Sequence, residues 1–151
     1  MHPLPPDYRT RPMTLDDLSE TAQLANAYAS RFRDGDMTNE QQLRGLMTTP
    51  GFDRDTSSRW VIDASGRPAA AAFVFHRSPH VRIQAWGLVG ESHQGRGIGS
   101  ALHAWILTRA QAAVDLAPNG AQVALRQQNL DRDDAAATFL HGSGYALTRH
   151  Y

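Results

Sequence analysis

The residues with the clearest chemical meaning are the six from Gln94 to Gly99, which read Gln-Gly-Arg-Gly-Ile-Gly. They follow an apolar, strand-like run over residues 85–89 and open a helix-like run from 98 to about 113. A strand, a glycine-rich turn and a helix start in this order gather several backbone N–H groups at the positive end of a helix dipole. The segment therefore predicts a site for a ligand that carries phosphates.

The spacing within this segment excludes two common classes of nucleotide-binding loop. A Walker loop requires a lysine after its last glycine, and the chain contains no lysine. The dinucleotide fingerprint requires a third glycine where this chain has Ser100, and it belongs to the first strand-to-helix turn of a domain. Here the loop lies two thirds of the way along the chain, so neither class fits.

The segment resembles the acyl-CoA-binding motif of the GCN5-related N-acetyltransferases, Q/R-x-x-G-x-G/A. Gln94, Gly97 and Gly99 stand at its three fixed positions. The resemblance implies that the backbone N–H groups of the loop hold the CoA pyrophosphate, and that the end of the preceding strand offers backbone groups to the pantetheine arm. The acyl-CoA-binding residues implied in this way are Leu88, Val89, Gln94, Gly95, Arg96, Gly97, Ile98, Gly99, Ser100 and Phe139.

A second segment, residues 133–145, resembles the later motif of that family, N-x-x-A-x-x-aromatic-Y-x-x-x-G-F. The matching positions are Ala136, Phe139 and Gly144. Leu140 departs from the motif, because many members carry there the tyrosine proposed to protonate the departing thiolate. Asp133 replaces the usual asparagine and Tyr145 the phenylalanine. The resemblance therefore assigns no general acid, and Tyr145 or solvent would have to supply the proton.

A proton acceptor is also needed, because an amine with a lysine-like pKa is mostly protonated at neutral pH. Family members often carry a glutamate or histidine on the central strand, near the positions that Ile83 and Ala85 occupy here. Glu91 and His93, at the mouth of that strand, are the nearest ionisable groups and are the catalytic candidates. The alternative for each is a solvated loop residue.

Composition narrows the chemistry further. The chain has 15 arginines and 15 acidic residues, and the arginines are scattered, which is unlike a nucleic-acid binder. It has no cysteine, so a thiolate metal site and a cysteine acyl-enzyme are excluded. His76 and His80 do not indicate a shared metal site, because Pro79 lies between them. We expect no metal, a direct acyl transfer and an exposed His103.

Length and hydropathy predict one soluble domain. Its 151 residues are enough for a single core over residues 8–151, with residues 1–7 as a flexible, proline-rich tail. The longest apolar run, residues 69–75, is far shorter than the roughly 18 residues of a membrane span, and the N-terminus lacks the order of a signal peptide. We therefore expect a cytoplasmic protein that does not bind membranes.

The hydrophobic pattern predicts the order β-α-α-β-β-β-α-β-α-β. Thr14 is expected to cap the first helix, Thr38 and Gln41 to form a capping box for the second, and Asp133 to cap the last. The expected strands cover residues 8–11, 58–63, 69–76, 81–89, 122–126 and 146–150. The expected helices run from the Thr14 cap to about residue 31, from Thr38 to Pro50, from 98 to about 113, and from the Asp133 cap through residue 141.

This order implies a GNAT-like α/β (α+β) fold with a mixed, mostly antiparallel sheet flanked by helices. Family members usually finish with one more strand than the pattern shows, so we expect an exposed sheet edge and a homodimer that covers it. The expected function is transfer of acetyl from acetyl-CoA to a small-molecule or peptide amine, by direct attack in a ternary complex. The alternative is a CoA-binding or assembly domain of the same fold with little catalytic power.

Overall fold

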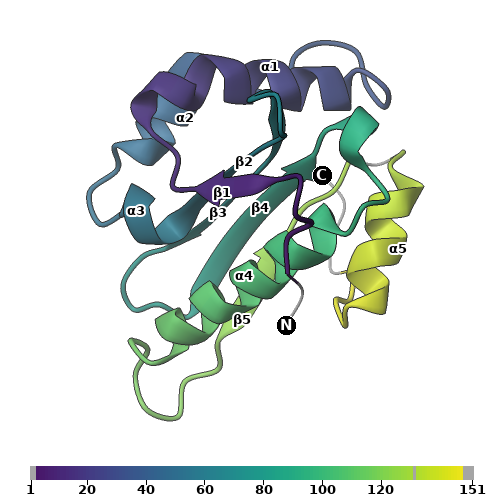
Figure 1. Ribbon diagram of the computed structural model, residues 1–151. Coiled ribbons are helices and arrows are strands. Elements are labelled where there is room, and N and C mark those ends of the chain that lie inside the picture. The colour runs from purple at the N-terminus through teal and green to yellow at the C-terminus, as the bar shows by residue number, and fades with distance from the viewer. Residues whose placement is uncertain (1–2, 131, 148–151) are drawn as a thin grey trace.

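A central sheet of five strands organises the molecule in the computed structural model, which describes residues 3–130 and 132–147 (Figure 1). The strands lie in chain order, and every neighbouring pair is antiparallel except β4 and β5, which are parallel. Their bounds are Arg9–Arg11 for β1, Ser58–Ile62 for β2, Pro68–His76 for β3, Arg82–Val89 for β4 and Ala124–Gln127 for β5. The mixed, mostly antiparallel sheet expected from the sequence is confirmed.

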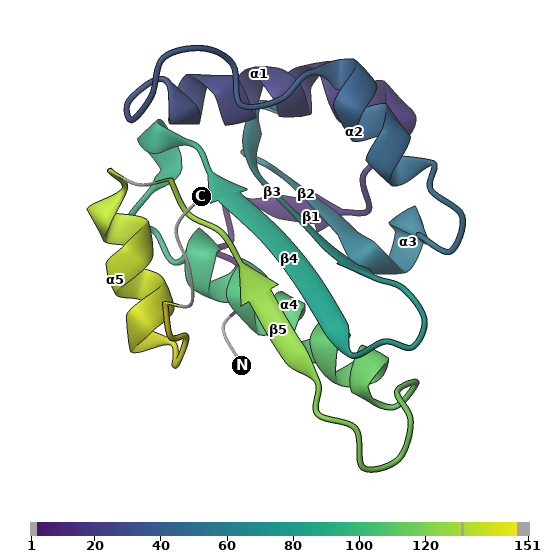
Figure 2. The same ribbon diagram turned by 180° about the vertical axis from the view of Figure 1, so that it is seen from behind.

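Helices cover both faces of this sheet (Figures 1 and 2). One face packs against the first two α-helices and the other against α4. The helices are η1 (Leu15–Asp17), α1 (Leu18–Ala29), α2 (Glu40–Met47), α3 (Arg54–Ser57), η2 (Glu91–His93), α4 (Ile98–Val114) and α5 (Asp134–Gly142). None of them, within the described ranges, has both the length and the apolar character needed to cross a membrane.

The two packed faces explain the unbroken apolar run in β3. Successive side chains of a strand point to opposite faces, so a strand covered on both sides has no polar alternation. Ala70 and Ala72 join the cluster under α4, whereas Ala71 joins the cluster under α1 and α2. Trp60 anchors the second cluster and Ile98 the first.

Two helix starts differ from the expected caps. Asn39, and not Thr38, caps α2, because its side chain accepts a hydrogen bond from the Gln42 N–H at 2.8 Å. Thr14 does form a capping box with Asp17, but the first turn is a 3-10 turn and α1 begins only at Leu18. The short helix α3 was not expected, and β5 begins two residues later than the pattern indicated.

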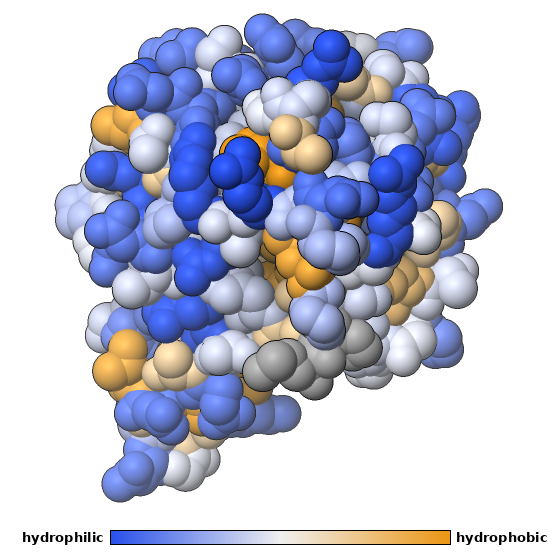
Figure 3. Space-filling model, viewed as in Figure 1, coloured by the Kyte–Doolittle hydropathy of each residue, from blue (hydrophilic) through white to orange (hydrophobic). Residues whose placement is uncertain are grey.

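The chain ends differ in how they meet the core. Leu4 is partly buried against the cluster under α4. At the other end, α5 has no buried residue, and Ala146 and Leu147 form no strand; residues 148–150 of the strand expected there lie outside the described residues. On the face of Figure 1 the surface is mostly hydrophilic, with hydrophobic residues in small separate patches (Figure 3).

Candidate functional site

The glycine loop between η2 and α4 has a backbone that favours glycine at two positions. Gly95 has a φ of 77° and Gly97, the residue that precedes α4, a φ of 89°. A residue with a Cβ atom pays roughly 1–2 kcal/mol for this left-handed conformation. These two glycines therefore let the chain turn sharply from η2 into the helix.

The turn leaves a row of hydrogen-bond donors without protein partners. Over the described residues, none of the backbone N–H groups from Gly95 to Ser100 donates to a protein acceptor; Ala101 is the first to do so, to Gly97 O at 3.1 Å. The first N–H groups of any helix lack partners within the helix, and the helix dipole adds positive potential there. The loop and the start of α4 thus leave N–H groups open to an anion, and the expected pyrophosphate site stays a prediction.

Two side chains of the loop are fixed by contacts at its base. Gln94 donates from Nε2 to Val89 O at 3.2 Å, which ties the loop to the end of β4. Arg96 donates from Nη1 to the hydroxyl of Tyr8 at 3.2 Å. The Arg96 side chain stays exposed, although its guanidinium is directed toward Tyr8.

Strand β4 has an open edge next to this loop. It pairs with β3 as far as Val89, but with β5 only from Arg82 to Ala85. Ala124 N–H donates to Val81 O, which shows that odd-numbered residues of β4 turn their backbone groups toward β5. Figure 2 shows that β5 ends before β4 does. Beyond Ala85 the backbone groups of Gly87 and Val89 therefore face a side on which β5 no longer pairs, which is a gap in the pairing of the sheet.

This alternation corrects one of the two strand residues expected to face the ligand. Leu88 turns its backbone groups toward β3, because Gly90 N–H donates to Ala69 O and Leu88 is two residues away on the same side. Val89 has the expected direction, and Gly87 joins it. Gly87 could not be predicted from the sequence. The side toward which a strand residue turns its backbone N–H and C=O depends on the register of the paired strands.

A cluster of polar side chains, from α4, the segment after α5 and the end of β5, lies on the far side of this gap. Gln127 donates from Nε2 to the Tyr145 hydroxyl at 2.8 Å, and His103 Nε2 lies 3.1 Å from the same oxygen. Phe139 packs edge-on against the His103 ring, with centroids 5.5 Å apart. The expectation of an exposed His103 is wrong, because the residue is half-buried between α5 and β5.

Tyr145 is held as a neutral phenol in this cluster. Burial raises the pKa of Tyr145, and the hydrogen bond from Gln127 only partly offsets that effect. The side chain of Gln127 donates to the oxygen, and His103 Nε2, 3.1 Å away, is the acceptor within reach of the Tyr145 proton. The structure thus places a protonated hydroxyl beside the gap, on the same short segment as Leu140.

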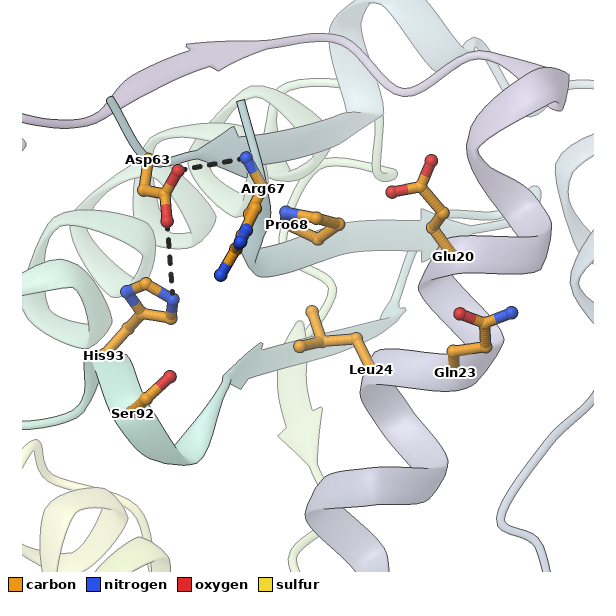
Figure 4. A pocket seen from close by; sticks show the side chains of 8 residues that line it. All are labelled: Glu20, Gln23, Leu24, Asp63, Arg67, Pro68, Ser92 and His93. Atoms are coloured by element: carbon orange, nitrogen blue, oxygen red, sulfur yellow. Dashed lines mark hydrogen bonds and ion pairs between the residues drawn. The ribbon is translucent and has the colours of Figure 1, made fainter. Parts of the chain in front are cut away.

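On the opposite side of η2, a hollow of about 460 Å³ lies between α1 and the β2–β3 hairpin (Figure 4). Glu20 comes from α1, Asp63 and Arg67 from the hairpin and His93 from η2. The Ser65 hydroxyl and the Arg67 N–H stabilise the Asp63 carboxylate and lower the pKa of Asp63. The hollow therefore presents carboxylate charge near a histidine.

The two catalytic candidates have different surroundings. His93 is largely buried: its Nδ1 lies 2.8 Å from the Tyr8 hydroxyl, and its Nε2 lies 4.0 Å from Asp63 Oδ2. Glu91 is exposed and makes a long ion pair with Arg31, with 3.6 Å between Arg31 Nε and Glu91 Oε1. Among the two, Glu91 has the freer carboxylate and His93 the more organised environment.

A histidine pair lies at the opposite end of β3. The Nδ1 atoms of His76 and His80 lie 2.7 Å apart, so Pro79 does not separate the rings. Burial lowers the pKa of His76, and the nearby His80 adds to that effect. No third histidine, carboxylate or thiol joins them into a metal-binding group within the described part of the chain.

Comparison with solved structures identifies the fold. The chain superposes on a GCN5-related N-acetyltransferase from Sphaerobacter thermophilus with a TM-score of 0.85 at 24% identity, covering 95% of this chain and 45% of that one. It matches yncA from Salmonella typhimurium, solved with its cofactor acetyl-CoA, with a TM-score of 0.64 at 15% identity, covering 95% of this chain and 82% of that one. A spermidine N-acetyltransferase chimera from Vibrio cholerae and hSSAT gives 0.64 at 15% identity, with 95% and 83% covered.

These matches show a likeness of structure and not of sequence. The sequence matches no protein-family model and no curated protein. The chain spans less than half of the Sphaerobacter protein. The chain therefore has the fold of the GCN5-related N-acetyltransferases.

Proposed function

We propose that this protein is an acyl-CoA-dependent N-acyltransferase that transfers acetyl from acetyl-CoA to an amine. The observation that supports this best is the run of unpaired N–H groups from Gly95 to Ser100, next to the open edge of β4. Six donors at a helix start suit a pyrophosphate, and an unpaired strand edge suits an extended arm with amide groups. CoA has both parts in one molecule.

The residues of this chain that would hold the donor lie along one path. The N–H groups of the loop, with Arg96, would take the pyrophosphate. The backbone groups of Gly87 would pair with the pantetheine arm, and the Val89 N–H would polarise the thioester carbonyl, whereas the Val89 oxygen already accepts from Gln94. Phe139 and Tyr145 would line the α5 side of the same gap.

The amine would approach from the side of α1. Glu20 and Asp63 in the hollow, together with the exposed Glu91, would attract an ammonium group before it loses its proton. One structural neighbour is a spermidine N-acetyltransferase, which is consistent with a small amine as the acceptor class. We assign proton acceptance to Glu91, directly or through water.

The chemistry needs no covalent enzyme intermediate. The amine nitrogen attacks the thioester carbon, the C–N bond forms and the C–S bond breaks. One proton leaves the amine and one reaches the departing sulfur, so the products are an amide and CoA. A chain without cysteine fits such a direct transfer.

The test is a steady-state assay in which a thiol reagent measures the release of free CoA. The panel of acceptors contains monoamines, polyamines and peptides with a free N-terminal amine. The absence of cysteine removes any background from the protein itself. We expect acetyl-CoA-dependent release that one class of amine accelerates. Tight CoA binding without release by any amine would instead support a CoA-binding or assembly domain, and the absence of CoA binding would refute both.

A further inference from the structure

The hydroxyl oxygen of Tyr8 connects the N-terminal segment to the glycine loop and to η2 through hydrogen bonds. This residue is 7% exposed and packs in the core cluster under α4. Its hydroxyl meets two groups that are distant in sequence, Arg96 Nη1 at 3.2 Å and His93 Nδ1 at 2.8 Å. The same oxygen therefore contacts both ends of the segment that joins η2 to the loop.

The direction of each hydrogen bond follows from counting protons. Arg96 can only donate, so the Tyr8 oxygen accepts from it. If His93 Nδ1 also donated, the Tyr8 proton would have no acceptor in the described part of the chain, which is unfavourable for a buried hydroxyl. We therefore assign the Tyr8 O–H as the donor to His93 Nδ1.

This assignment fixes the tautomer of His93. With Nδ1 as acceptor, the proton of the neutral ring lies on Nε2, which faces Asp63 Oδ2 at 4.0 Å. Asp63 is a carboxylate, because its Oδ1 accepts from Ser65 and Arg67. The negative Asp63 thus favours an Nε2–H, and the arrangement is consistent from Asp63 through His93 and Tyr8 to Arg96 (Figure 4 shows its first two members).

We propose that Tyr8 is a positioning residue for acyl-CoA binding, and that His93 acts through it and not as the base. The shared hydroxyl holds the Arg96 guanidinium by one of its nitrogens, which limits where the charge of this loop residue can lie. It also uses the Nδ1 lone pair of His93, which a base would need. This proposal rests on the proposed function, because it assumes that the loop binds the CoA pyrophosphate.

The experiment is calorimetric titration of CoA into four proteins: wild type, Tyr8→Phe, Arg96→Ala and the double variant. Tyr8→Phe keeps the buried ring and removes only the hydroxyl. Losing a hydrogen bond that positions a charged group should weaken CoA binding roughly 10-fold. The double variant should bind about as weakly as Arg96→Ala alone, since both changes remove the same contact.

Two measurements separate positioning from a general loss of stability. Thr108→Val removes an exposed hydroxyl from α4, the helix that begins at the glycine loop. This hydroxyl bonds only Ala104 O, so the change should leave CoA affinity unchanged. Titration with pantetheine, which lacks the pyrophosphate, should not distinguish Tyr8→Phe from wild type. A structural defect would weaken both ligands.

The outcomes are distinct. No CoA binding by wild type would refute the proposed function and this inference with it. Binding by wild type with equal affinity in Tyr8→Phe, or additive losses in the double variant, would overturn this inference alone. Should Tyr8→Phe fail to fold, Arg96→Ala remains decisive, because its side chain is exposed: unchanged CoA affinity there would also overturn the proposal.

Discussion

The side-chain amide of Gln127 donates a hydrogen bond to the hydroxyl of Tyr145, with 2.8 Å between Nε2 and the phenol oxygen. Gln127 is the last residue of β5, and Tyr145 follows α5, so this contact closes the far side of the gap along β4. It also orients the phenol, since the oxygen accepts from Gln127 and the Tyr145 proton can be donated toward His103 Nε2. Leu140, five residues earlier, offers no such group.

We expect Tyr145→Phe to lower kcat for acetyl transfer by roughly 10²-fold, the low end for loss of a general acid. The physical reason is that the departing thiolate would lose its nearest proton donor. CoA affinity should change little, because the phenyl ring remains. Since the pKa of Tyr145 is raised, the wild-type rate should persist to at least about pH 10, the ordinary value for tyrosine, before this donor loses its proton.

The control for this prediction is His141→Ala. His141 lies in the last turn of α5, exposed, and makes no contact with the Tyr145 hydroxyl. Its kcat should stay within about twofold of wild type. A large loss in His141→Ala with unchanged CoA affinity would identify His141 as the acid and contradict the assignment to Tyr145.

A second prediction concerns Leu140, the position where the resemblance would place a tyrosine. In a Tyr145→Phe background, Leu140→Tyr should restore part of the lost turnover, because it returns a phenol to the α5 side of the gap. The measurement is kcat with acetyl-CoA saturating. The same double variant with Leu140→Phe is the control, since it adds the ring without the hydroxyl, and equal rates for the two would exclude rescue by a proton donor.

A third prediction tests the backbone of the loop. Gly97→Val should weaken CoA binding by at least 10-fold, because a β-branched residue at a φ of 89° is strained and the loop must change shape to relieve it. No side chain or backbone atom lies within 4 Å of a Cβ placed there, so the effect comes from the backbone and not from a clash. Isothermal titration with CoA measures it.

Gly45→Ala is the matched control. Gly45 lies inside α2, without a positive φ and with nothing within 4 Å of the added Cβ. Alanine should stabilise the helix by about 0.5–1 kcal/mol and leave CoA affinity unchanged. Equal CoA affinity of Gly97→Val and wild type would disprove the pyrophosphate assignment.

The sequence predicted the elements that local patterns define. Hydrophobic periodicity of 3.6 located α4. Two strand-like runs on either side of turn-forming residues located the β2–β3 hairpin, and the glycine loop was found from its spacing. The choice between neighbouring cap residues was harder to predict. Thr38 and Asn39 can both cap α2, and Asn39 does so. The Thr38 N–H, which the expected capping box would pair with Gln41, donates to Asn26 Oδ1. Such choices depend on contacts between elements.

The contacts that organise the site are long in sequence and left no local pattern. Tyr8 is 85 residues from His93 and 88 from Arg96, and His103 is 42 from Tyr145. Single tyrosines and histidines of this kind are more often simple core or surface residues. The sequence offers one indirect signal for His103. This residue follows the glycine loop within two helical turns, so it must lie near the expected acyl-CoA site.

The last prediction concerns stability away from the site. Asp17 is 8% exposed and accepts two hydrogen bonds from Arg11, at 2.7 and 2.9 Å, and two more from the N–H and hydroxyl of Thr14. Asp17→Asn should lower the free energy of unfolding by about 1 kcal/mol, because an amide cannot accept all four bonds and the charge that pairs with Arg11 is lost. Asp16→Asn, exposed in the same turn, should change it by less than about 0.5 kcal/mol.

The pH dependence of this effect has a definite sign. Burial disfavours the Asp17 carboxylate, but the bonds from Arg11 and Thr14 outweigh it and lower the pKa of Asp17. A lowered pKa in the folded state adds stability above about pH 3.9, the ordinary value for aspartate, and this stability is lost as the pH falls through the lowered pKa. Urea unfolding from pH 7 to pH 2 should show wild type and Asp17→Asn converging only below about pH 4. A constant difference across that range would show that the carboxylate charge of Asp17 contributes nothing to folding.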